Sequence, residues 1–279
     1  MFLVTADPQA SGDLPQHGPP EPRGLHRRRA AALIALALGL AGLVISAYGM
    51  AIQLLPRQFS AAQRQQIVNW EIASRWQQLP AGRIFPASVP YQLPAWVLQD
   101  TTPLDLNALR IGIAPQSGCG AGVTTPAAAA VLRRDGCQAV LRATYVDSTW
   151  SYVMTVGVAV LPSDAAAAKA SQSLSQPRLT AARSTETGGL AAGVLVVRYR
   201  GTAAAIYDYS RQISKSFADG PYLVMYTVGY ADSRPRVPVS RDPYSATQMT
   251  DLAQGVAQSV ADTLAAPPAT PRCPGSPGC

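Results

Sequence analysis

An uncharged apolar run near the N-terminus constrains this chain more than any other feature. Residues 30–52 form 23 consecutive positions without a charged side chain. As a helix that rises about 1.5 Å per residue, the run reaches about 35 Å, enough to cross a hydrocarbon core of about 30 Å with some tilt. The apolar region of a secretory signal is shorter, at about 7–15 residues. Residues 30–52 are therefore predicted to be a transmembrane anchor, with a cleaved signal peptide as the alternative.

The charges that flank this run predict its orientation. Residues 27–29 are three arginines directly before it, whereas only Arg57 and Arg64 follow closely. Because basic clusters stay in the cytoplasm, we expect a single-pass protein of the cell membrane whose N-terminus is cytoplasmic. The expected segments are a disordered cytoplasmic lead at 1–29, the anchor at 30–52, an extracytoplasmic domain at 57–266 and a Pro-rich tail at 267–279.

The four cysteines all lie on the side predicted to be external. An even number of cysteines in an oxidising compartment favours disulfides, and four cysteines allow three connectivities. The predicted pairs are Cys119–Cys137 and Cys273–Cys279. Between the first two, the sequence predicts a turn, a short helix capped by Thr125 and a second turn, so the chain returns to where it began. No metal site is expected, because the sequence has no C-x-x-C motif and no histidine near these cysteines.

Histidine is missing from the whole predicted external domain. The only two histidines are His17 and His26, both in the lead. The domain therefore cannot form a Ser-His-Asp or Cys-His catalytic set, nor supply the histidine ligands of most catalytic zinc sites. Phosphate-binding glycine motifs are also absent, so no cofactor and no catalytic residue is predicted.

Carboxylate chemistry is what remains for an enzyme. A cell-wall glycan hydrolase needs two acids across a cleft, and Asp147, Asp208 and Asp219 are the candidates. Asp147 and Asp219 are more simply interpreted as turn residues, because they stand in "YVDSTW" and "FADGPY". The leading expectation is therefore a protein that is not an enzyme, with this hydrolase as the alternative.

The predicted external part is basic, which bears on its partners. From residue 58 onward, 18 Arg and Lys stand against 13 Asp and Glu, a net charge of +5. Phosphate-rich polymers and anionic lipid head groups are plausible neighbours of such a surface. No nucleic-acid partner is expected, because no basic run interleaves with aromatic residues outside the flank of the anchor.

Hydrophobic periodicity predicts an α+β domain, an antiparallel sheet of five to six strands with packed helices, preceded by one transmembrane helix. Helices are predicted at 61–79 with Ser60 as N-cap, at 126–134, from Ser163 onward, and after Pro243 with an apolar stripe of Met249, Leu252, Val256, Val260 and Leu264. Strands are predicted at 109–114, at 139–145 and 152–160 as a hairpin with one buried face, and at 193–200, 203–214 and 221–231.

Two resemblances follow from this layout. The element order resembles the PsbP-like α/β sandwich of exported lipoproteins and sensor modules. The basic lead, the run at 30–52 and the cysteine-containing segment at 118–161 look like uncharacterised single-pass, membrane-anchored extracytoplasmic proteins of high-GC actinobacteria. Only two of the 23 basic residues are lysines, as a GC-rich genome favours. The resemblance implies a location in the cell envelope and no particular activity.

Tyrosines and arginines are crowded into the last three predicted strands. The candidate ligand-binding residues are Tyr207, Tyr209, Arg211 and Arg198, and the other members of the cluster are Tyr199, Tyr222, Tyr226, Tyr230 and Arg200. Amphipathic rings beside guanidinium groups suit glycans, lipid head groups or protein partners, whereas a helix-covered or solvated sheet face is the structural alternative. The favoured hypothesis is a non-catalytic domain that binds an envelope component or another membrane protein. A structural subunit of a membrane complex is a further alternative.

Overall fold

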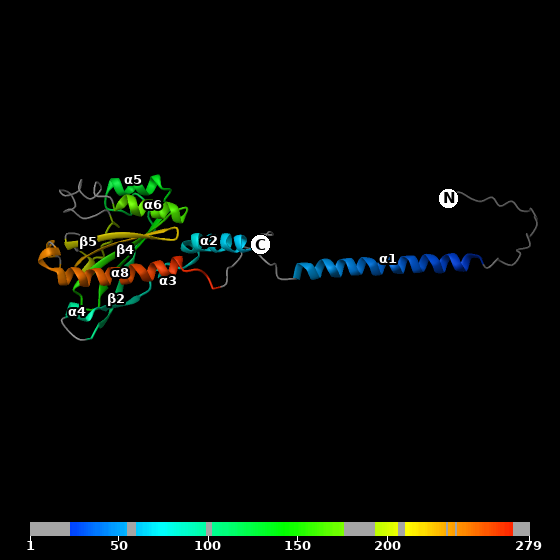
Figure 1. The fold of residues 1–279 in the computed structure, drawn as a ribbon, viewed down its shortest axis with the longest axis horizontal. Coiled ribbons are helices and arrows are strands. Elements are labelled where there is room, and N and C mark those ends of the chain that lie inside the picture. Colours follow the sequence, from blue (N-terminus) through cyan, green and yellow to red (C-terminus); the bar gives the residue numbers. More distant parts are fainter. Residues whose placement is uncertain are drawn as a thin grey trace, which may run out of the picture. The chain divides into compact units, whose positions relative to one another are not determined.

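The computed structural model describes residues 23–54, 60–98, 102–175, 193–205, 210–232, 234–237 and 239–269. The chain divides into two compact units, Met1–Phe59 and Ser60–Cys279. In the first unit, α1 (Arg23–Leu54) contains the stretch Arg29–Met50, which is long and apolar enough to cross a membrane and buries none of its surface in the protein (Figure 1). This candidate span coincides with the predicted anchor.

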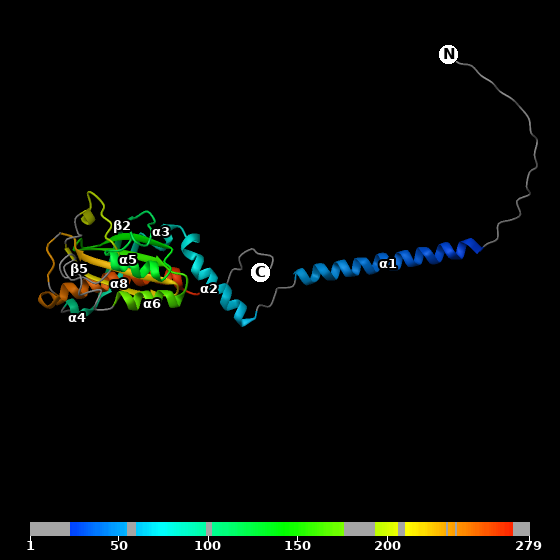
Figure 2. The same cartoon turned by 90° about the horizontal axis from the view of Figure 1, so that it is seen from above.

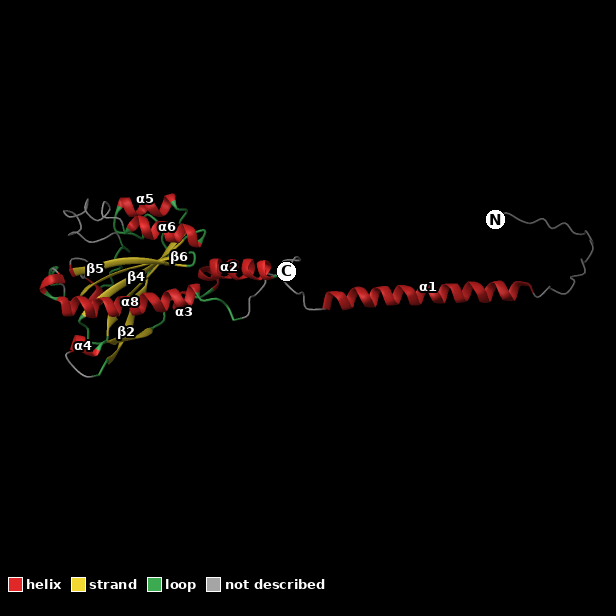
Figure 3. Ribbon diagram, viewed as in Figure 1, coloured by secondary structure: helices red, strands yellow, loops and turns green. Residues whose placement is uncertain are grey.

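The second unit is built on one sheet of six antiparallel strands, as the sequence predicted. The strands lie in the order β1-β2-β3-β4-β6-β5, so β1 and β5 are the edges. Figure 3 shows the strands in yellow and the helices packed on them in red. The strands are β1 (Ser88–Leu93), β2 (Leu104–Ile113), β3 (Ala139–Asp147), β4 (Tyr152–Val160), β5 (Arg211–Asp219) and β6 (Tyr222–Tyr230). Strand β1 escaped sequence analysis because Pro90 interrupts its pattern. An edge strand tolerates proline, since it needs only one row of ladder hydrogen bonds.

Helices cover both faces of this sheet (Figure 1). The long helix α8 (Pro243–Ala265) packs on one face, and its predicted stripe from Met249 to Leu264 is fully buried there. Helices α5 (Pro126–Arg134) and α6 (Asp164–Leu174) pack on the other face. Shorter helices are α3 (Ala81–Ile84), α4 (Ala95–Leu98) and the 3-10 turns η1 (Ala203–Ala205) and η3 (Val239–Arg241).

The predicted helix at 61–79 forms as α2 (Ala61–Gln78), and Ser60 caps it in a reciprocal capping box with Gln63. Helix α2 docks on the domain at the C-terminal end of α8. The Arg75 guanidinium donates to the carbonyl oxygens of Leu264 (3.0 Å) and Ala266 (2.7 Å). The Tyr222 hydroxyl donates to the carbonyl oxygen of Ile72 at 2.5 Å. The Arg75 bonds satisfy carbonyls at the C-terminal end of α8, and the Tyr222 bond fixes the middle of α2 to β6, which explains why α2 belongs to this unit.

The prediction of a single buried hairpin face was wrong for β4. All nine residues of β4 are buried. Its residues at even positions, such as Met154 and Val156, contact the core beneath α8, whereas Val153 and Ala159 belong to clusters on the opposite face. The alternation of apolar and polar residues indicated a solvent-facing side. The polar residues on that side are instead covered by another segment of the chain.

That covering segment is residues 193–197, which the sequence predicted to begin a strand. It is no regular strand but a strap that crosses the sheet, with one isolated bridge between Val194 and Val123. In place of the backbone hydrogen bonds of a β-ladder, hydroxyl groups of the strands bond the backbone of this strap. Thr144 donates to the Val197 carbonyl at 3.0 Å, and Thr227 donates to the Val194 carbonyl at 3.3 Å. Buried threonines therefore satisfy backbone groups that would otherwise be unpaired.

The prediction of a strand at 203–214 was also wrong in its position. Residues 203–205 form η1, and β5 begins only at Arg211 and continues to Asp219. Residues 206–209 lie outside the described part of the chain. The strand at 221–231 and the hairpin strands agree with β6, β3 and β4 within about two residues.

Gly157 makes room for the strap, and this predicts a measurable cost of filling that space. A Cβ atom on Gly157 would lie 2.5 Å from Cγ2 of Val194, which is fully buried. We expect Gly157→Ala to reduce the free energy of unfolding by about 1–3 kcal/mol, because overpacking forces the strap off the sheet. Urea denaturation measures the change. Gly82→Ala is the control, since its Cβ meets only an Arg110 atom at 3.8 Å, and equal stability of both variants would contradict the strap contact.

Cys119 and Cys137 form a disulfide with a Cα–Cα distance of 6.1 Å, which confirms that part of the sequence prediction. Helix α5 lies between them with Thr125 as its N-cap, as expected. The predicted pair Cys273–Cys279 lies outside the described residues. Next to the bridge, the nearly buried Asp135 carboxylate pairs with Arg134 (2.7 Å) and Lys169 (3.2 Å), and hydrogen bonding to Arg134 is the main reason its pKa is lowered.

Candidate ligand-binding site

The residues singled out from the sequence are only partly described by the structure. Tyr207 and Tyr209 lie outside the described residues. Arg198 is exposed in the segment that follows the strap, and Arg211 is half-buried at the start of β5. The proposed Tyr/Arg face therefore stays a prediction at these positions.

For three other tyrosines of the predicted Tyr/Arg cluster, the prediction of a binding face was wrong. Tyr222, Tyr226 and Tyr230 do share one face of β6, as their spacing indicated, but that face is the core beneath α8. Burial raises the pKa of Tyr226 to about 12 and that of Tyr222 to about 12. A binding surface cannot be built from buried rings. Tyr230, at the end of β6, also lines a pocket.

This pocket lies where β6 ends and α8 begins, at the opposite end of α8 from the docked helix α2 (Figure 2). It has a volume of about 230 Å³. We call it the Trp150 pocket, and its lining residues are Trp150, Ser151, Tyr152, Tyr230, Asp232, Arg234 and Ser245. They come from the β3–β4 turn, from the ends of β4 and β6, and from the first turn of α8.

Trp150 is held in the pocket wall by an unusual backbone conformation. Its φ angle is +59°, in the left-handed region that costs a residue with a Cβ about 1–2 kcal/mol. It is the one non-glycine residue with positive φ among the described residues, and its side chain is 60% exposed. Such strain persists only where the surroundings impose it, and it concentrates at functional sites.

Asp147 imposes that conformation from beneath. Its side chain is nearly fully buried and accepts hydrogen bonds from the backbone amides of Thr149 (3.0 Å), Ser151 (2.8 Å) and Tyr152 (2.7 Å). The Thr149 hydroxyl donates to the same carboxylate. The prediction of Asp147 as a turn residue is therefore confirmed, and the turn that it organises presents Trp150.

The opposite wall combines an aromatic ring with a cation. The Arg234 guanidinium carbon lies 4.5 Å from the centre of the Tyr230 ring, and Arg234 is paired with Asp232 at 2.5 Å. The Tyr152 ring lies 5.9 Å from that of Tyr230. A guanidinium over a ring face is attracted by the ring quadrupole, so Arg234 is oriented before any ligand arrives.

The hydroxyl groups of the pocket are also held in place. Tyr152 donates to Gln248 at 2.6 Å, and Tyr230 donates to Asp242, the N-cap of α8, at 2.8 Å. Burial is the main reason that the pKa of each tyrosine is raised, so both stay protonated donors. Hydrogen bonding to Ser245 lowers the pKa of Asp242, so this carboxylate is ionised at neutral pH.

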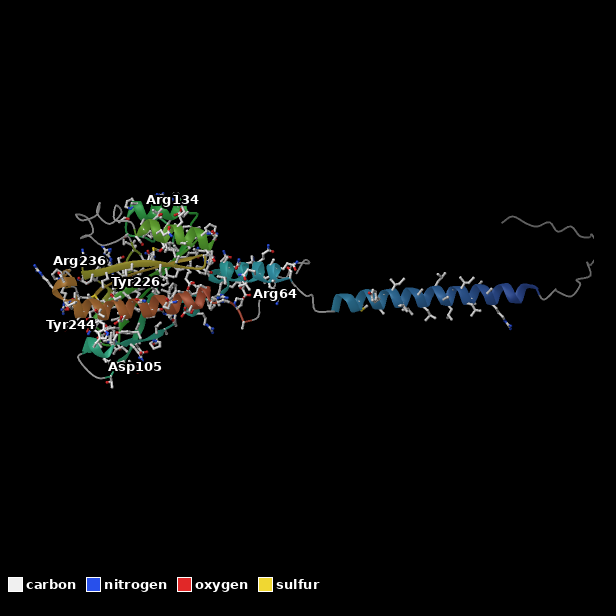
Figure 4. All side chains as sticks on the ribbon, viewed as in Figure 1. Arg64, Asp105, Arg134, Tyr226, Arg236 and Tyr244 are labelled. Atoms are coloured by element: carbon white, nitrogen blue, oxygen red, sulfur yellow. A yellow bond between two sulfur atoms is a disulfide. The ribbon has the colours of Figure 1, made fainter. Side chains whose placement is uncertain are left out.

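Exposed aromatic residues gather at this end of the domain. Outside α1, the exposed aromatic side chains among the described residues are Trp70, Trp96, Trp150 and Tyr244. Tyr244, labelled in Figure 4, adjoins Ser245 of the pocket. Trp96 lies on α4, which follows β1 at the same end of the sheet. Sequence analysis missed this site because its residues come from three connections, although "DSTWSY" and "DSRPRVPVSRDPY" carry the aromatic and arginine signals.

The acids considered for hydrolysis are not brought together. Strand register aligns Asp219 with Tyr222 and, through β4, with Ala139. Asp147 lies eight residues further along β3, which corresponds to about 26 Å. A glycosidase pair needs about 5–9 Å. Asp208 lies outside the described residues, and no group of three metal-ligating side chains occurs within the described ranges.

One half-buried carboxylate predicts how stability depends on pH. Burial raises the pKa of Asp251, on α8, and its Oδ2 atom has no hydrogen-bond partner. The folded state therefore holds the proton more tightly than the unfolded state, and ionisation destabilises the fold as pH rises above about 4. We expect Asp251→Asn to raise stability at pH 7 by up to about 1 kcal/mol and to have no effect below about pH 3.5.

Thermal unfolding at several pH values tests this expectation. Asp262→Asn is the control, because that carboxylate lies exposed on the same helix and accepts a hydrogen bond from Gln258. A gain for Asp251→Asn that is the same at pH 3 and pH 7 would show that ionisation is not the cause.

No protein-family model, no curated protein and no solved structure matches this chain. Its function is therefore inferred from its own residues.

Proposed function

We propose that this protein is a non-catalytic, membrane-anchored binding domain that recognises a component of the cell envelope through the Trp150 pocket. The observation that carries the proposal is the strained, exposed Trp150, held by buried Asp147 beside the Tyr230–Arg234 stack. Backbone strain concentrates at functional sites, so a strained backbone that presents an exposed ring supports a role of Trp150 in ligand contact.

The location is part of the same proposal. The candidate span in α1 anchors the chain, and the arginines before it orient the second unit outside the cytoplasm. The Cys119–Cys137 disulfide supports an oxidising compartment. The resemblance to single-pass envelope proteins of actinobacteria points to the same place.

Retention on envelope material tests the proposal, with full-length protein in nanodiscs and the insoluble cell envelope of the native host. We expect Trp150→Gly to reduce the retained fraction at least tenfold, because the ring that contacts the ligand is lost. Glycine adopts a φ of +59° without strain, so this variant keeps the turn intact.

Trp70→Ala is the control, because alanine preserves the helix whereas glycine would weaken it. Trp70 is 44% exposed on α2, at the other end of the domain, and its loss should leave retention unchanged. Equal retention of wild type and Trp150→Gly would refute the Trp150 pocket as the binding site.

A further inference from the structure

The Trp150 pocket carries information about the chemistry of its ligand. Its volume of about 230 Å³ is below the roughly 300–1,000 Å³ of pockets that enclose drug-sized molecules. The pocket therefore accommodates one ring-sized unit and leaves the rest of a larger ligand on the surface. The surface around the pocket carries Trp150 and Tyr244, at 60% and 48% exposure.

The lining suits a ring that is apolar on its face and polar around its edge. The exposed Trp150 side chain offers a ring face, while the Ser151 and Ser245 hydroxyls and the Arg234 guanidinium offer polar atoms. A pyranose ring has this character, with C–H groups on its faces and hydroxyls at its edge. Aromatic faces attract such weakly positive C–H groups.

The charges around the pocket favour an anion. Asp232 is occupied by Arg234, and Asp242 accepts from Tyr230 and caps α8. Both carboxylates have a lowered pKa, in each case mainly through side-chain hydrogen bonds. The charge of Asp232 is thus balanced by Arg234, and the oxygens of Asp242 are taken up by hydrogen bonds within the protein.

Two further cations lie on the same connection between β6 and α8. Arg236, labelled in Figure 4, and Arg241 are both exposed, and neither forms an ion pair with a carboxylate of the described residues. With Arg234, they give this connection three guanidinium groups within eight residues. Guanidinium groups bind carboxylate and phosphate oxygens through paired hydrogen bonds.

We infer that the Trp150 pocket binds an anionic saccharide, a glycan chain in which sugar rings alternate with carboxylate or phosphate groups. One sugar ring lies in the pocket against Trp150, and the acidic groups contact Arg236 and Arg241. This inference rests on the proposed function and names the substance that the site recognises.

Binding of defined oligosaccharides tests the inference, again with full-length protein in nanodiscs of neutral lipid. The probes are hexagalacturonate, which carries carboxylates, and maltohexaose, which is neutral and has the same number of rings. We expect hexagalacturonate to bind at least tenfold more tightly at 50 mM salt, and this preference to shrink at 500 mM salt, because exposed charges are screened.

Variants test separately the arginines that would contact the acidic groups and the tryptophan that would contact the sugar ring. Arg236→Gln with Arg241→Gln should weaken hexagalacturonate binding about tenfold and leave maltohexaose binding unchanged. Arg64→Gln with Arg133→Gln removes the same charge from exposed positions outside the pocket and should change neither. Trp150→Gly should abolish binding of both probes.

Several results would overturn the inference. Equal affinity for both probes would refute the anionic character, and so would an unchanged affinity in the Arg236/Arg241 variant. Binding to phosphatidylglycerol vesicles but to neither oligosaccharide would identify a lipid surface instead. If neither probe binds while retention on the envelope still depends on Trp150, the saccharide is wrong and the proposed function stands. Loss of that dependence would refute the proposed function itself.

Discussion

Replacing Asp147 with alanine is expected to lower the free energy of unfolding by about 3 kcal/mol and to abolish retention on envelope material. The carboxylate accepts from three backbone amides and one hydroxyl. Thr149 and Ser151 are exposed, so water can replace their bonds, but the Tyr152 amide is buried and would stay unpaired. Leaving a buried donor unsatisfied costs about 1–3 kcal/mol, and the lost bonds to a charged acceptor add to this.

The binding defect follows from the same change. Without the carboxylate, the turn keeps the bond from the Trp150 amide to the main-chain carbonyl of residue 147 but loses the bonds of the neighbouring amides, so we expect the left-handed backbone of Trp150 to relax and the ring to leave the pocket wall. Chemical denaturation and the retention assay measure the two effects on one variant.

Asp105→Ala is the matched control. Asp105 is exposed on β2 and accepts from the side chain of Gln92, so its removal should change stability by less than about 0.5 kcal/mol (Figure 4). A stable Asp147→Ala variant that still binds would mean that the turn is held by other contacts. A stable variant that loses activity on glycans would instead revive the hydrolase alternative.

Replacing both Cys119 and Cys137 with serine is expected to cost about 3 kcal/mol. The bridge closes a loop with a sequence separation of 18, and a loop of this length restricts the unfolded chain by about that amount. The same loop holds the strap, because the Leu195 amide donates to the Gly122 carbonyl at 2.8 Å and the Thr124 amide donates to the Gly193 carbonyl at 3.0 Å.

The disulfide therefore has a local effect besides the global one. In the double-serine variant, amide hydrogen exchange at Leu195 and Val197 should speed up more than in the centre of β4. Wild-type protein in reducing agent should show the same exchange rates and the same loss of stability as the variant, both measured relative to oxidised wild-type protein. If exchange accelerates equally everywhere, the loop does not hold the strap separately from the rest of the fold.

Local patterns in the sequence determined most of the helices and central strands. The capping residues Ser60, Thr125 and Ser163 begin α2, α5 and α6, and the apolar stripe of α8 is buried as expected. Caps and periodicity are short-range properties, which is why they can be identified without a fold. The pairing of Cys119 with Cys137 was equally local, since the chain between them turns back on itself.

Only the tertiary structure decided what covers each surface and which side chains meet. The threonines of β3, β4 and β6 alternate as solvent-facing residues do, yet they are buried because the strap crosses them. The tyrosines of β6 belong to the core because α8 lies on that face. The Trp150 pocket joins residues as far apart along the chain as Trp150 and Ser245, and its position follows from the pairing of β4 with β6. A sequence pattern gives the spacing of side chains along one element. Which of these side chains are buried, and which of them contact each other, depends on segments that are distant in the sequence.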